Sequence, residues 1–532
     1  MRMARSISHA IAILAVLAIV LGACTGTTSG GPSGSAATGA KAVYGGSVTF
    51  AMNSDISNMD PMLSGLFVDR HLMYAMYDSL VRVTPKGEII PWLATKWTIS
   101  PDGKTYTFTL RTDVKYHDGT PFDAASAKWN LDRYRSTKES LRLGELAPVD
   151  TVTAVDAATL KVDLKTPSAP FLSVLVDRSG MMLSQKVVEA GGADFTRKAF
   201  NAGSGPFILT EAVKDDHYAF KKNPSWWGTA ANGDKLPYLD TVIIKPITDG
   251  DVRLTNVRTG QVQATNAVTG KDVPTVKGDS TLVYQEIAGI GYNSLVPNRT
   301  AGFIFAEKRY IQAVDYAMDR NELLNKGPAQ GVGVVGYGPY APSHFSYDPN
   351  FKPFEKPDIA KAKQLVADVG KGPLKFELLV SSGDAATLQF AQLLQSQLAK
   401  ADITMDIKTL LFNDIVALQQ KHQQSGMTLI GWSGRIDPDG NTYDFNYTGR
   451  PNNDSAYSNK DVDSLLDQTR TATDQAKRKD LFQKAQQIFV VDDPARIFYS
   501  FNAAQLLTAK AIQGFEVYPD QLPRFQTVWV QK

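Results

Sequence analysis

The only cysteine of this 532-residue chain, Cys24, is the residue whose type and position most directly suggest chemistry. It follows an apolar stretch over residues 11–21, and the ten residues before that stretch carry two arginines and no acid. The stretch is about half as long as a membrane-spanning helix needs to be. A basic start, a short apolar segment and small residues before a cleavage point are typical of a secretory signal. We therefore expect residues 1–23 to be removed from the mature chain.

Cys24 is also the residue to which a lipid would be attached. Residues 21–24, Leu-Gly-Ala-Cys, resemble the bacterial lipoprotein signal, in which the cysteine is acylated and the chain is cleaved before it. Acylation would remove a free thiol that is otherwise reactive in a secreted protein. Residues 26–40 have no charge and almost no apolar bulk, so residues 24–44 are predicted to be a flexible tether. The alternative is an ordinary signal with an incidental cysteine.

Patterns typical of enzymes and metal sites are absent from the sequence. Histidine occurs six times, without metal-ligand spacing, at His9, His71, His117, His217, His344 and His422. No zinc-protease or nucleophile-elbow motif occurs, and residues 437–441, "DPDGN", start like a calcium loop but lack its twelfth-position glutamate. We expect that the chain is not an enzyme and that it holds no cofactor and no metal ion.

The composition excludes several classes of partner. Without residues 1–23 the chain has equal numbers of basic and acidic side chains and no basic run, so we expect no nucleic-acid binding. No later segment is apolar for long enough to span a membrane, so we expect a soluble folded body. A body of roughly 490 residues is larger than one hydrophobic core supports, which predicts at least two lobes.

The hydrophobic periodicity predicts an α/β fold with mixed sheets. Alternating patterns predict strands over residues 46–52, 104–111, 159–165, 217–223, 240–247, 374–382, 404–410 and 525–532. Helical spacing predicts helices over residues 69–80, 124–134, 251–259, 308–324, 358–369, 385–401, 462–473 and 475–491. Asp319 and Arg320 are expected to mark a change from one helix to the next. The order strand, helix, strand after residues 370–373 predicts a βαβ unit with parallel strands.

Several motifs together resemble one family. Residues 77–133, "YDSLVRVTPKGEIIPWLATKWTISPDGKTYTFTLRTDVKYHDGTPFDAASAKWNLDR", are similar to the signature of the family 5 extracellular solute-binding proteins. "GSGPFILTE", "KKNPSWWG" and "IGWSGRIDPDGNTYDFNY" follow in the family's order, and the likeness covers nearly all of residues 45–530. Members of this family are receptors of ABC importers for peptides, oligopeptides, nickel and opines.

The resemblance implies a two-lobed, periplasmic-binding-protein-like fold with hinge segments and an extra subdomain. Lobe I would comprise residues 45–288 and 506–532, with the subdomain at about 85–205. Lobe II would comprise residues 289–505. The solute would be enclosed between the lobes by hinge closure, which lets a transporter distinguish a loaded receptor from an empty one.

The resemblance also implies a ligand-binding segment, with one departure. In dipeptide receptors of the family, a Trp of the segment that matches residues 431–441 packs on the ligand, and an Asp pairs with the ligand's α-ammonium. Gly431, Trp432, Ser433 and Gly434 match this segment, but Arg435 occupies the position of the Asp. A guanidinium cannot pair with an ammonium. Either Asp437 replaces that Asp, or the ligand presents a carboxylate or phosphate, or Arg435 faces solvent.

Other candidates for the cleft follow from the same resemblance. Asn53, Ser54 and Asp55 match the loop after the first strand. Tyr337 and Tyr340 lie in a loop shaped by Gly and Pro, and Tyr443 follows the "DPDG" turn. Aromatic side chains with a few polar groups suit ligands of mixed character.

The sequence thus predicts a lipid-anchored, extracytoplasmic receptor that delivers a peptide-like solute to an ABC permease. We expect a monomer held at the membrane by acylated Cys24, on the periplasmic face if the cell has two membranes. Two alternatives on the same fold are a receptor for an opine-like or small acidic conjugate and a receptor for a chelated metal or haem. An alternative of another class is an extracellular chaperone or signalling subunit without import.

Overall fold

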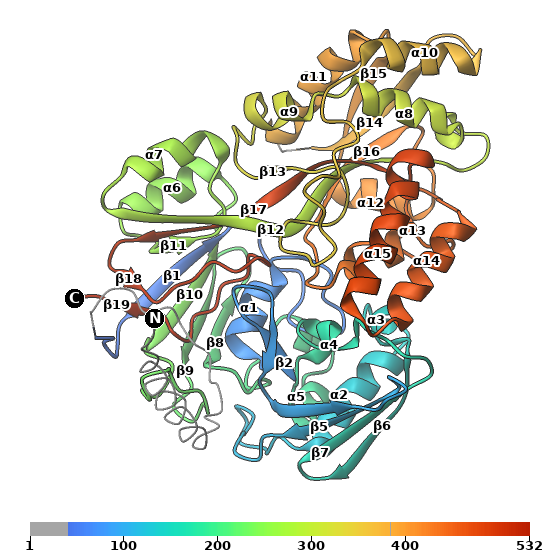
Figure 1. The fold of residues 1–532 in the computed structure, drawn as a ribbon. Helices are drawn as coiled ribbons and strands as arrows, with labels where there is room; N and C mark the ends of the chain where they lie inside the picture. The colour runs from blue at the N-terminus through green and yellow to red at the C-terminus, as the bar shows by residue number, and fades with distance from the viewer. Residues whose placement is uncertain (1–40, 383–384) are drawn as a thin grey trace, which may run out of the picture.

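A computed structural model gives the fold of residues 41–382 and 385–532 (Figure 1). The predicted signal, the predicted acylation site Cys24 and the first part of the predicted tether lie outside these described residues. Residues 41–44, the end of the predicted tether, contain no helix or strand.

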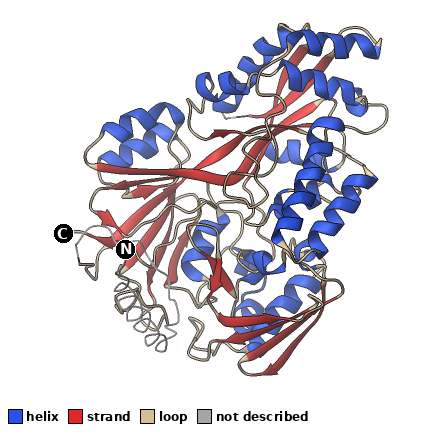
Figure 2. Cartoon of the chain, viewed as in Figure 1, coloured by secondary structure: helices blue, strands red, loops and turns tan. Residues whose placement is uncertain are grey.

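Two long strands, β12 (Leu282–Pro297) and β17 (Ile497–Ala509), run antiparallel through the middle of the molecule (Figure 2). Within the described residues they are the centre of one eleven-stranded sheet. Its order is β15 (Thr404–Leu410), β14 (Lys375–Ser381), β16 (Met427–Trp432), β12, β17, β11 (Ala264–Thr265), β1 (Ser47–Met52), β10 (Thr241–Pro246), β9 (His217–Lys222) and β8 (Phe207–Val213), with β13 (Val334–Val335) paired to β17. The ladder between β12 and β17 is interrupted between Ala288 and Tyr292.

The sheet is mixed. β1 is parallel to both its neighbours, as is β14, whereas all other neighbouring pairs are antiparallel. The predicted βαβ unit is confirmed, because β14 and β15 are parallel and α11 (Ala385–Ala399) connects them. This combination of parallel and antiparallel strands with helices confirms the predicted α/β fold class.

A separate antiparallel sheet lies at one end of the molecule (Figure 1). Its order is β4 (Ala94–Ile99), β5 (Thr105–Leu110), β7 (Thr159–Leu164) and β6 (Val149–Asp156). Tyr106, Phe108 and Leu110 alternate with less buried residues along β5, so one face is buried, as period-two patterning predicts. Helix α2 (Ala124–Ser136) begins with a capping box between Asp123 and Ser126.

The predicted helix over residues 308–324 is two helices, α8 (Lys308–Ala317) and α9 (Arg320–Lys326). Asp319 is extended between them, and its carboxylate accepts a hydrogen bond of 2.9 Å from the Glu322 backbone N–H. An aspartate in this position satisfies a free N–H at the start of a helix. The change of helix expected at Asp319 and Arg320 is therefore confirmed.

The remaining elements connect and cover these sheets. They are α1 (Asp69–Met76), β2 (Val81–Val83), β3 (Ile89–Pro91), α3 (Leu143–Leu146), α4 (Phe171–Val174), α5 (Gln185–Gly191), α6 (Gly250–Arg258), α7 (Val273–Gly278), α10 (Ile359–Val369), α12 (Phe412–Gln420), α13 (Tyr443–Asn446), α14 (Lys460–Thr471), α15 (Gln475–Gln486), β18 (Ile512–Gln513) and β19 (Trp529–Val530). Short irregular helical turns are η1 (Arg178–Gly180), η2 (Gly192–Thr196), η3 (Gly270–Asp272), η4 (Ile304–Ala306), η5 (Pro438–Asn441) and η6 (Gln487–Asp492).

The buried apolar side chains form separate cores. The largest core joins residues 48–264 to residues 506–529, and two others lie within residues 292–501. We call the part around the first core lobe I and the part around the other two lobe II. The predicted boundaries, near residues 288 and 505, fall inside β12 and β17 and stay a prediction.

Candidate functional site

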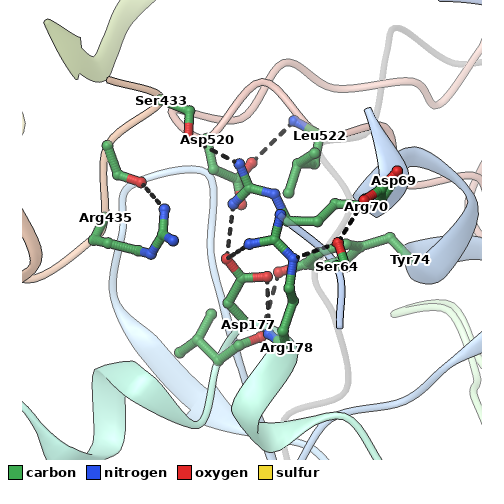
Figure 3. Close-up of polar contacts among 12 residues, drawn as sticks. Ser64, Asp69, Arg70, Tyr74, Asp177, Arg178, Ser433, Arg435, Asp520 and Leu522 are labelled. Atoms are coloured by element: carbon green, nitrogen blue, oxygen red, sulfur yellow. Dashed lines mark hydrogen bonds and ion pairs between the residues drawn. The ribbon is translucent and has the colours of Figure 1, made fainter. Parts of the chain in front are cut away.

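The segment after β16, residues 431–435, lies where lobe I and lobe II meet. Arg70 of α1 donates a hydrogen bond of 3.2 Å from Nη2 to Ser433 Oγ, which links the two lobes (Figure 3). Gly434 has φ +80°, and a Cβ at this position would lie 2.3 Å from the carbonyl oxygen of Ile290. Glycine is therefore required where this segment crosses β12.

The buried amide of Asn441 fixes the conformation of this segment. Its Oδ1 accepts hydrogen bonds from Trp432 Nε1 at 3.1 Å and from the Arg435 backbone N–H at 2.8 Å. Its Nδ2 donates to the carbonyl oxygens of Ile290 at 2.9 Å and Pro339 at 3.0 Å. The four hydrogen bonds use every donor and acceptor site of the Asn441 side-chain amide. They hold the Trp432 side chain and the Arg435 backbone in place.

Arg435 is a cation with unused donors. Its guanidinium lies over the ring of Trp432, 4.5 Å from the centroid, and Nη1 donates to the carbonyl oxygen of Gly434 at 2.8 Å. The side chain is 22% exposed, and its nearest carboxylate oxygen, Glu145 Oε1, is 4.0 Å from Nη2. Burial lowers the pKa of Arg435, while the charge of Asp177 opposes this effect. Among the described residues, none accepts a hydrogen bond from its Nη2.

A buried carboxylate, Asp177, lies between two other arginines (Figure 3). Arg70 Nη1 contacts Asp177 Oδ2 at 2.7 Å, and the Arg178 backbone N–H donates to Oδ1 at 2.9 Å. The Arg178 guanidinium donates to Ser64 Oγ at 2.9 Å and to the carbonyl oxygen of Leu66 at 2.6 Å. Burial alone would raise the pKa of Asp177, but the surrounding guanidinium groups hold it well below its usual range.

Glu145 on α3 is the second carboxylate of this region. Arg142 Nη1 donates to Glu145 Oε1 at 2.7 Å, and the hydroxyl of Ser179 donates to Oε2. Four guanidinium groups, those of Arg70, Arg142, Arg178 and Arg435, therefore surround the carboxylates of Asp177 and Glu145. Burial and the charge of Arg70 lower the pKa of Arg178 well below its usual value, which reflects this crowding of positive charge.

Two hollows lie between the lobes. One of about 90 Å³ is lined by the Arg435 guanidinium and the Trp432 ring from lobe II and by Glu145 and Asp177 from lobe I. The other, of about 330 Å³, is lined half by polar residues, which include Asn53, Asn266, Asn293, Asn502 and Gln521, and half by apolar residues and glycine. A small charged hollow and a larger mixed one between the same two lobes suit a solute with at least one ionised group.

The structure brings only some of the predicted site residues to these hollows. Trp432 and Arg435 line the small hollow and Asn53 lines the larger one, whereas Gly431 lies on the wall of a third hollow inside lobe II. Asp437 lines none of these three hollows, and its carboxylate accepts two hydrogen bonds from Arg478.

The remaining predicted residues lie elsewhere. Asp55 accepts hydrogen bonds from Tyr218 Oη at 2.6 Å and from the Asp215 backbone N–H at 3.0 Å, on the surface of lobe I. Ser54, beside it, lines none of the three hollows. Tyr337 and Tyr340 line a separate hollow of about 250 Å³ within lobe II.

Tyr443 belongs to a core of lobe II. Its hydroxyl donates to Asp467 at 2.9 Å, and Arg470 covers its ring at 3.3 Å from the centroid. Contact of any of the predicted residues with a solute stays a prediction.

Sequence reasoning missed the arginines of lobe I. Arg70, Arg142 and Arg178 lie in segments without a recognisable binding motif, and the partners of Arg70 and Arg178 are distant in the sequence. The one available signal was the run Asp69-Arg70-His71 at the start of a helical pattern that is otherwise apolar and aromatic, in α1.

Two kinds of feature are absent from residues 41–382 and 385–532. No group of three or more His, Cys, Asp or Glu side chains is arranged to hold a metal ion. None of the helices there has both the length and the apolar character required to cross a bilayer.

Known proteins resemble this chain over most of its length. The family model for "Bacterial extracellular solute-binding proteins, family 5 Middle" matches residues 88–454. The glutathione-binding protein GsiB of Pectobacterium atrosepticum is 27% identical over 488 residues, which cover 90% of this chain and 92% of the relative. GsiB of Salmonella typhimurium is 28% identical over 491 residues, with 89% and 92% covered.

Solved structures share the fold. The periplasmic binding protein DppA of Helicobacter pylori, in complex with peptide STSA, superposes with a TM-score of 0.81 at 24% identity and covers 92% of this chain and 99% of its own. AgaA of A. tumefaciens R10, in complex with agropinic acid, gives a TM-score of 0.81 at 22% identity, with 92% and 99% covered. The fold predicted from the sequence, the two-lobed fold of periplasmic binding proteins, is thus confirmed.

Proposed function

The chain belongs to the bacterial extracellular solute-binding proteins of family 5, and on this premise we propose that it captures a peptide-like solute with an anionic group and delivers it to an ABC importer. The solute lies between lobe I and lobe II, and the importer's permease is the partner that receives it. The chain has no catalytic role. The names of its relatives, which bind glutathione, and the peptide in the similar structure support a peptide-like solute.

The proposal rests on the contacts and the exposure of the Arg435 guanidinium. Its guanidinium is stacked on Trp432, partly exposed to the hollow between the lobes, and makes one side-chain hydrogen bond, to its own neighbour Gly434. A guanidinium pairs best with a planar carboxylate, through two parallel hydrogen bonds. Glutathione, peptides with a free C-terminus and opines all carry such a group.

A second candidate, a receptor for an opine-like or other acidic conjugate, is favoured by the same residue together with Asp437. Arg478 already pairs with the Asp437 carboxylate, so this carboxylate is not available to an α-ammonium, whereas Arg435 Nη2 donates no hydrogen bond within the described residues and its contact with Glu145, at 4.0 Å, is long. The agropinic acid in the similar structure supports this candidate.

The location and the division of the chain are part of the proposal. Acylated Cys24 anchors the receptor outside the cytoplasm, with residues 24–44 as the tether, and the receptor is a monomer. Lobe I comprises residues 45–288 and 506–532 with its subdomain at about 85–205, and lobe II comprises residues 289–505. β12 and β17 are the segments that connect them.

Native mass spectrometry of the full chain, extracted in detergent and purified without added solute, tests the proposal. We expect a retained acidic solute that is lost from Arg435→Gln but kept by Arg258→Gln, a control on α6 whose side chain is 40% exposed. A peptide mass supports the first candidate, and a non-peptide acid supports the second. A neutral or cationic solute kept equally by both variants would contradict the role of Arg435.

Solution scattering tests the receptor function itself. Closure of the lobes on a solute predicts a smaller radius of gyration in the loaded protein than in the empty protein. An identical scattering envelope with a tightly bound solute would argue against capture between the lobes.

A further inference from the structure

A hollow of about 350 Å³ lies inside lobe II, next to the space between the lobes. We propose that this hollow, the apolar pocket, binds an uncharged apolar group of the solute whose acid lies at Arg435. The apolar pocket is defined by Leu323, Leu324, Phe390, Phe412, Leu429 and Tyr499. The inference rests on the proposed function for the acidic end and adds a second requirement on the solute.

The apolar pocket lies at the edge of the sheet where ligands bind in α/β proteins. Ser381 at the end of β14 and Gly431 near the end of β16 line it, as does Phe412, the first residue of α12, which follows β15. β14 is parallel to both β15 and β16, so the carboxyl ends of three strands meet here. Crevices outside the carboxyl ends of parallel strands are the usual ligand sites of such sheets.

The lining selects an uncharged group. No charged side chain occurs among the described residues that line the apolar pocket. The rings of Phe390 and Tyr499 are stacked, with centroids 4.4 Å apart, and form a flat aromatic wall. Transfer of an unpaired charge into such surroundings is costly, whereas an alkyl or aryl group gains free energy by leaving water.

The apolar pocket adjoins the larger hollow between the lobes. Four residues line both spaces: Asn293, Leu324, Ala329 and Ser500. Asn293 Nδ2 donates to Ser500 Oγ at 3.1 Å and to Asn502 Oδ1 at 2.6 Å, which holds this side chain at the boundary. A polar part of the solute can therefore lie beside Asn293 while an attached apolar part enters lobe II.

Gly431 leaves room for the Asn293 side chain at this boundary. A Cβ at this position would lie 2.6 Å from Asn293 Oδ1, so any other residue would displace the Asn293 side chain. Gly431 precedes Trp432, which lines the hollow at Arg435. Consecutive residues of a strand face opposite sides of the sheet, so the hollow at Arg435 and the apolar pocket lie on opposite faces of β16, at its carboxyl end.

The rim of the apolar pocket exposes a large apolar side chain. Phe412 is 47% exposed although it lines the pocket, and its neighbour Leu411 is 66% exposed without lining it. An apolar group in the pocket would cover part of the Phe412 ring. Leu411 provides a matched control, because it is the adjacent residue and is exposed to a similar degree.

The test compares glutathione with S-benzylglutathione by isothermal titration calorimetry on the full chain in detergent. Both probes carry the same carboxylates, and the second adds one aryl group. We expect S-benzylglutathione to bind about tenfold more tightly. Phe412→Ala should bring the ratio of the two affinities close to one, and Leu411→Ala should leave the ratio as in the wild type. Equal affinities of the wild type for the two probes would contradict the proposed role of the apolar pocket. They would not contradict the receptor function.

A second measurement separates failure of the apolar pocket from failure of the proposed function. Benzyl alcohol has no acid, so its binding does not depend on Arg435. Saturation-transfer NMR should detect benzyl alcohol bound to the wild type and to Arg435→Gln, with a weaker signal for Phe412→Ala. If neither glutathione binds but benzyl alcohol gives this pattern, the acid-binding function fails and the pocket stands. Absence of the benzyl alcohol signal in the wild type would overturn the pocket in either case.

Discussion

Arg478 holds the carboxylate of Asp437 through two hydrogen bonds of 2.9 Å, one to each oxygen. The side chains of Arg478 and Asp437 are only 7% and 12% exposed. The Arg478 Nε–H also donates to the Thr469 carbonyl oxygen at 2.9 Å, which connects the "DPDG" turn to α14 and α15. An ammonium at Asp437 would have to compete with a guanidinium that is already bound there.

Asp437→Asn should therefore reduce stability. Removal of one partner of a buried ion pair leaves an uncompensated charge, and we expect a loss of about 3 kcal/mol in the free energy of unfolding. Urea denaturation measures this loss. Asp480→Asn is the control, because Asp480 pairs with Lys484 at 2.7 Å on the surface, where ion pairs contribute less than about 1 kcal/mol. A stable Asp437→Asn variant that no longer retains the solute would instead place Asp437 in contact with it.

Gly434→Ala should destabilise the protein more than Gly449→Ala. Both glycines have positive φ, +80° and +72°, so both variants carry the cost of about 1–2 kcal/mol for a left-handed alanine. Only at Gly434 would the new Cβ meet backbone, at 2.3 Å from Ile290 O, whereas nothing lies within 4 Å of a Cβ at Gly449. Thermal unfolding of both variants gives the difference, and equal losses would show that the approach to β12 has no cost.

Stability should fall as the pH is lowered from about 6.5 to about 4. Burial lowers the pKa of His71 to about 4, so in this window the unfolded chain takes up a proton that the folded chain does not. We expect a loss of about 2 kcal/mol between pH 7 and pH 5 from His71 alone. Urea denaturation at both pH values measures it. Burial also lowers the pKa values of His117 and His344, which adds to the slope.

Two variants isolate the contribution of His71. His71→Gln should reduce the change of the free energy of unfolding with pH. The glutamine keeps an acceptor for Asn266, whose Nδ2 lies 2.8 Å from His71 Nε2. His217→Gln should not reduce this pH dependence, because Asp216 and Glu211 raise the pKa of His217. Protonation of His217 therefore favours the folded state as the pH falls. An unchanged slope in His71→Gln would contradict the assignment.

The mature chain should begin with a modified Cys24. Intact-mass spectrometry of protein extracted from membranes should show an amino terminus at Cys24 with added acyl mass. Cys24→Ser should lack the acyl mass, and Ser33→Ala, a change in the predicted tether, should keep it. An unmodified mature chain that begins at another residue would contradict lipid anchoring.

The elements that were predicted well are those with one buried face. Helix α11 buries Phe390, Ala391, Leu394 and Leu398, and its helical spacing was visible in the sequence. β5 and β7 alternate buried and less buried residues, which gives the period of two. In both cases a single face in contact with one core produces a regular pattern.

The two longest strands were not predicted, for a related reason. β12 and β17 pass from one core to another, and each contains runs of consecutive buried residues, so both of their sides are buried there and no period of two survives. β12 also contains Gly289 and Gly291, which normally indicate a break in a strand. The predicted strand over residues 525–532 is wrong in its extent, because only β19, Trp529–Val530, forms a strand there.

The site was predicted only where its residues belong to one short sequence motif. Trp432 and Arg435 were identified in one motif, and both line the hollow between the lobes. Arg70 contacts Ser433 across 363 positions of sequence and Asp177 across 107. The first contact arises from the packing of lobe I on lobe II and the second from packing within lobe I, and local sequence patterns encode neither.

The interruption of the ladder between Ala288 and Tyr292 has a mechanical consequence. On both sides of it, β12 and β17 are held together by backbone hydrogen bonds, so the paired strands resist twisting and sliding. At the interruption, a Cβ on Gly289 would lie 2.7 Å from Asn502 O and one on Gly291 would lie 2.4 Å from Trp432 O. The register shifts again between Asn293 and Ser294, so the irregular part of the ladder is the short stretch of β12 from Ala288 to Ser294. A receptor that hinges there would move its lobes as two rigid bodies, and a permease would meet two defined shapes instead of a continuum.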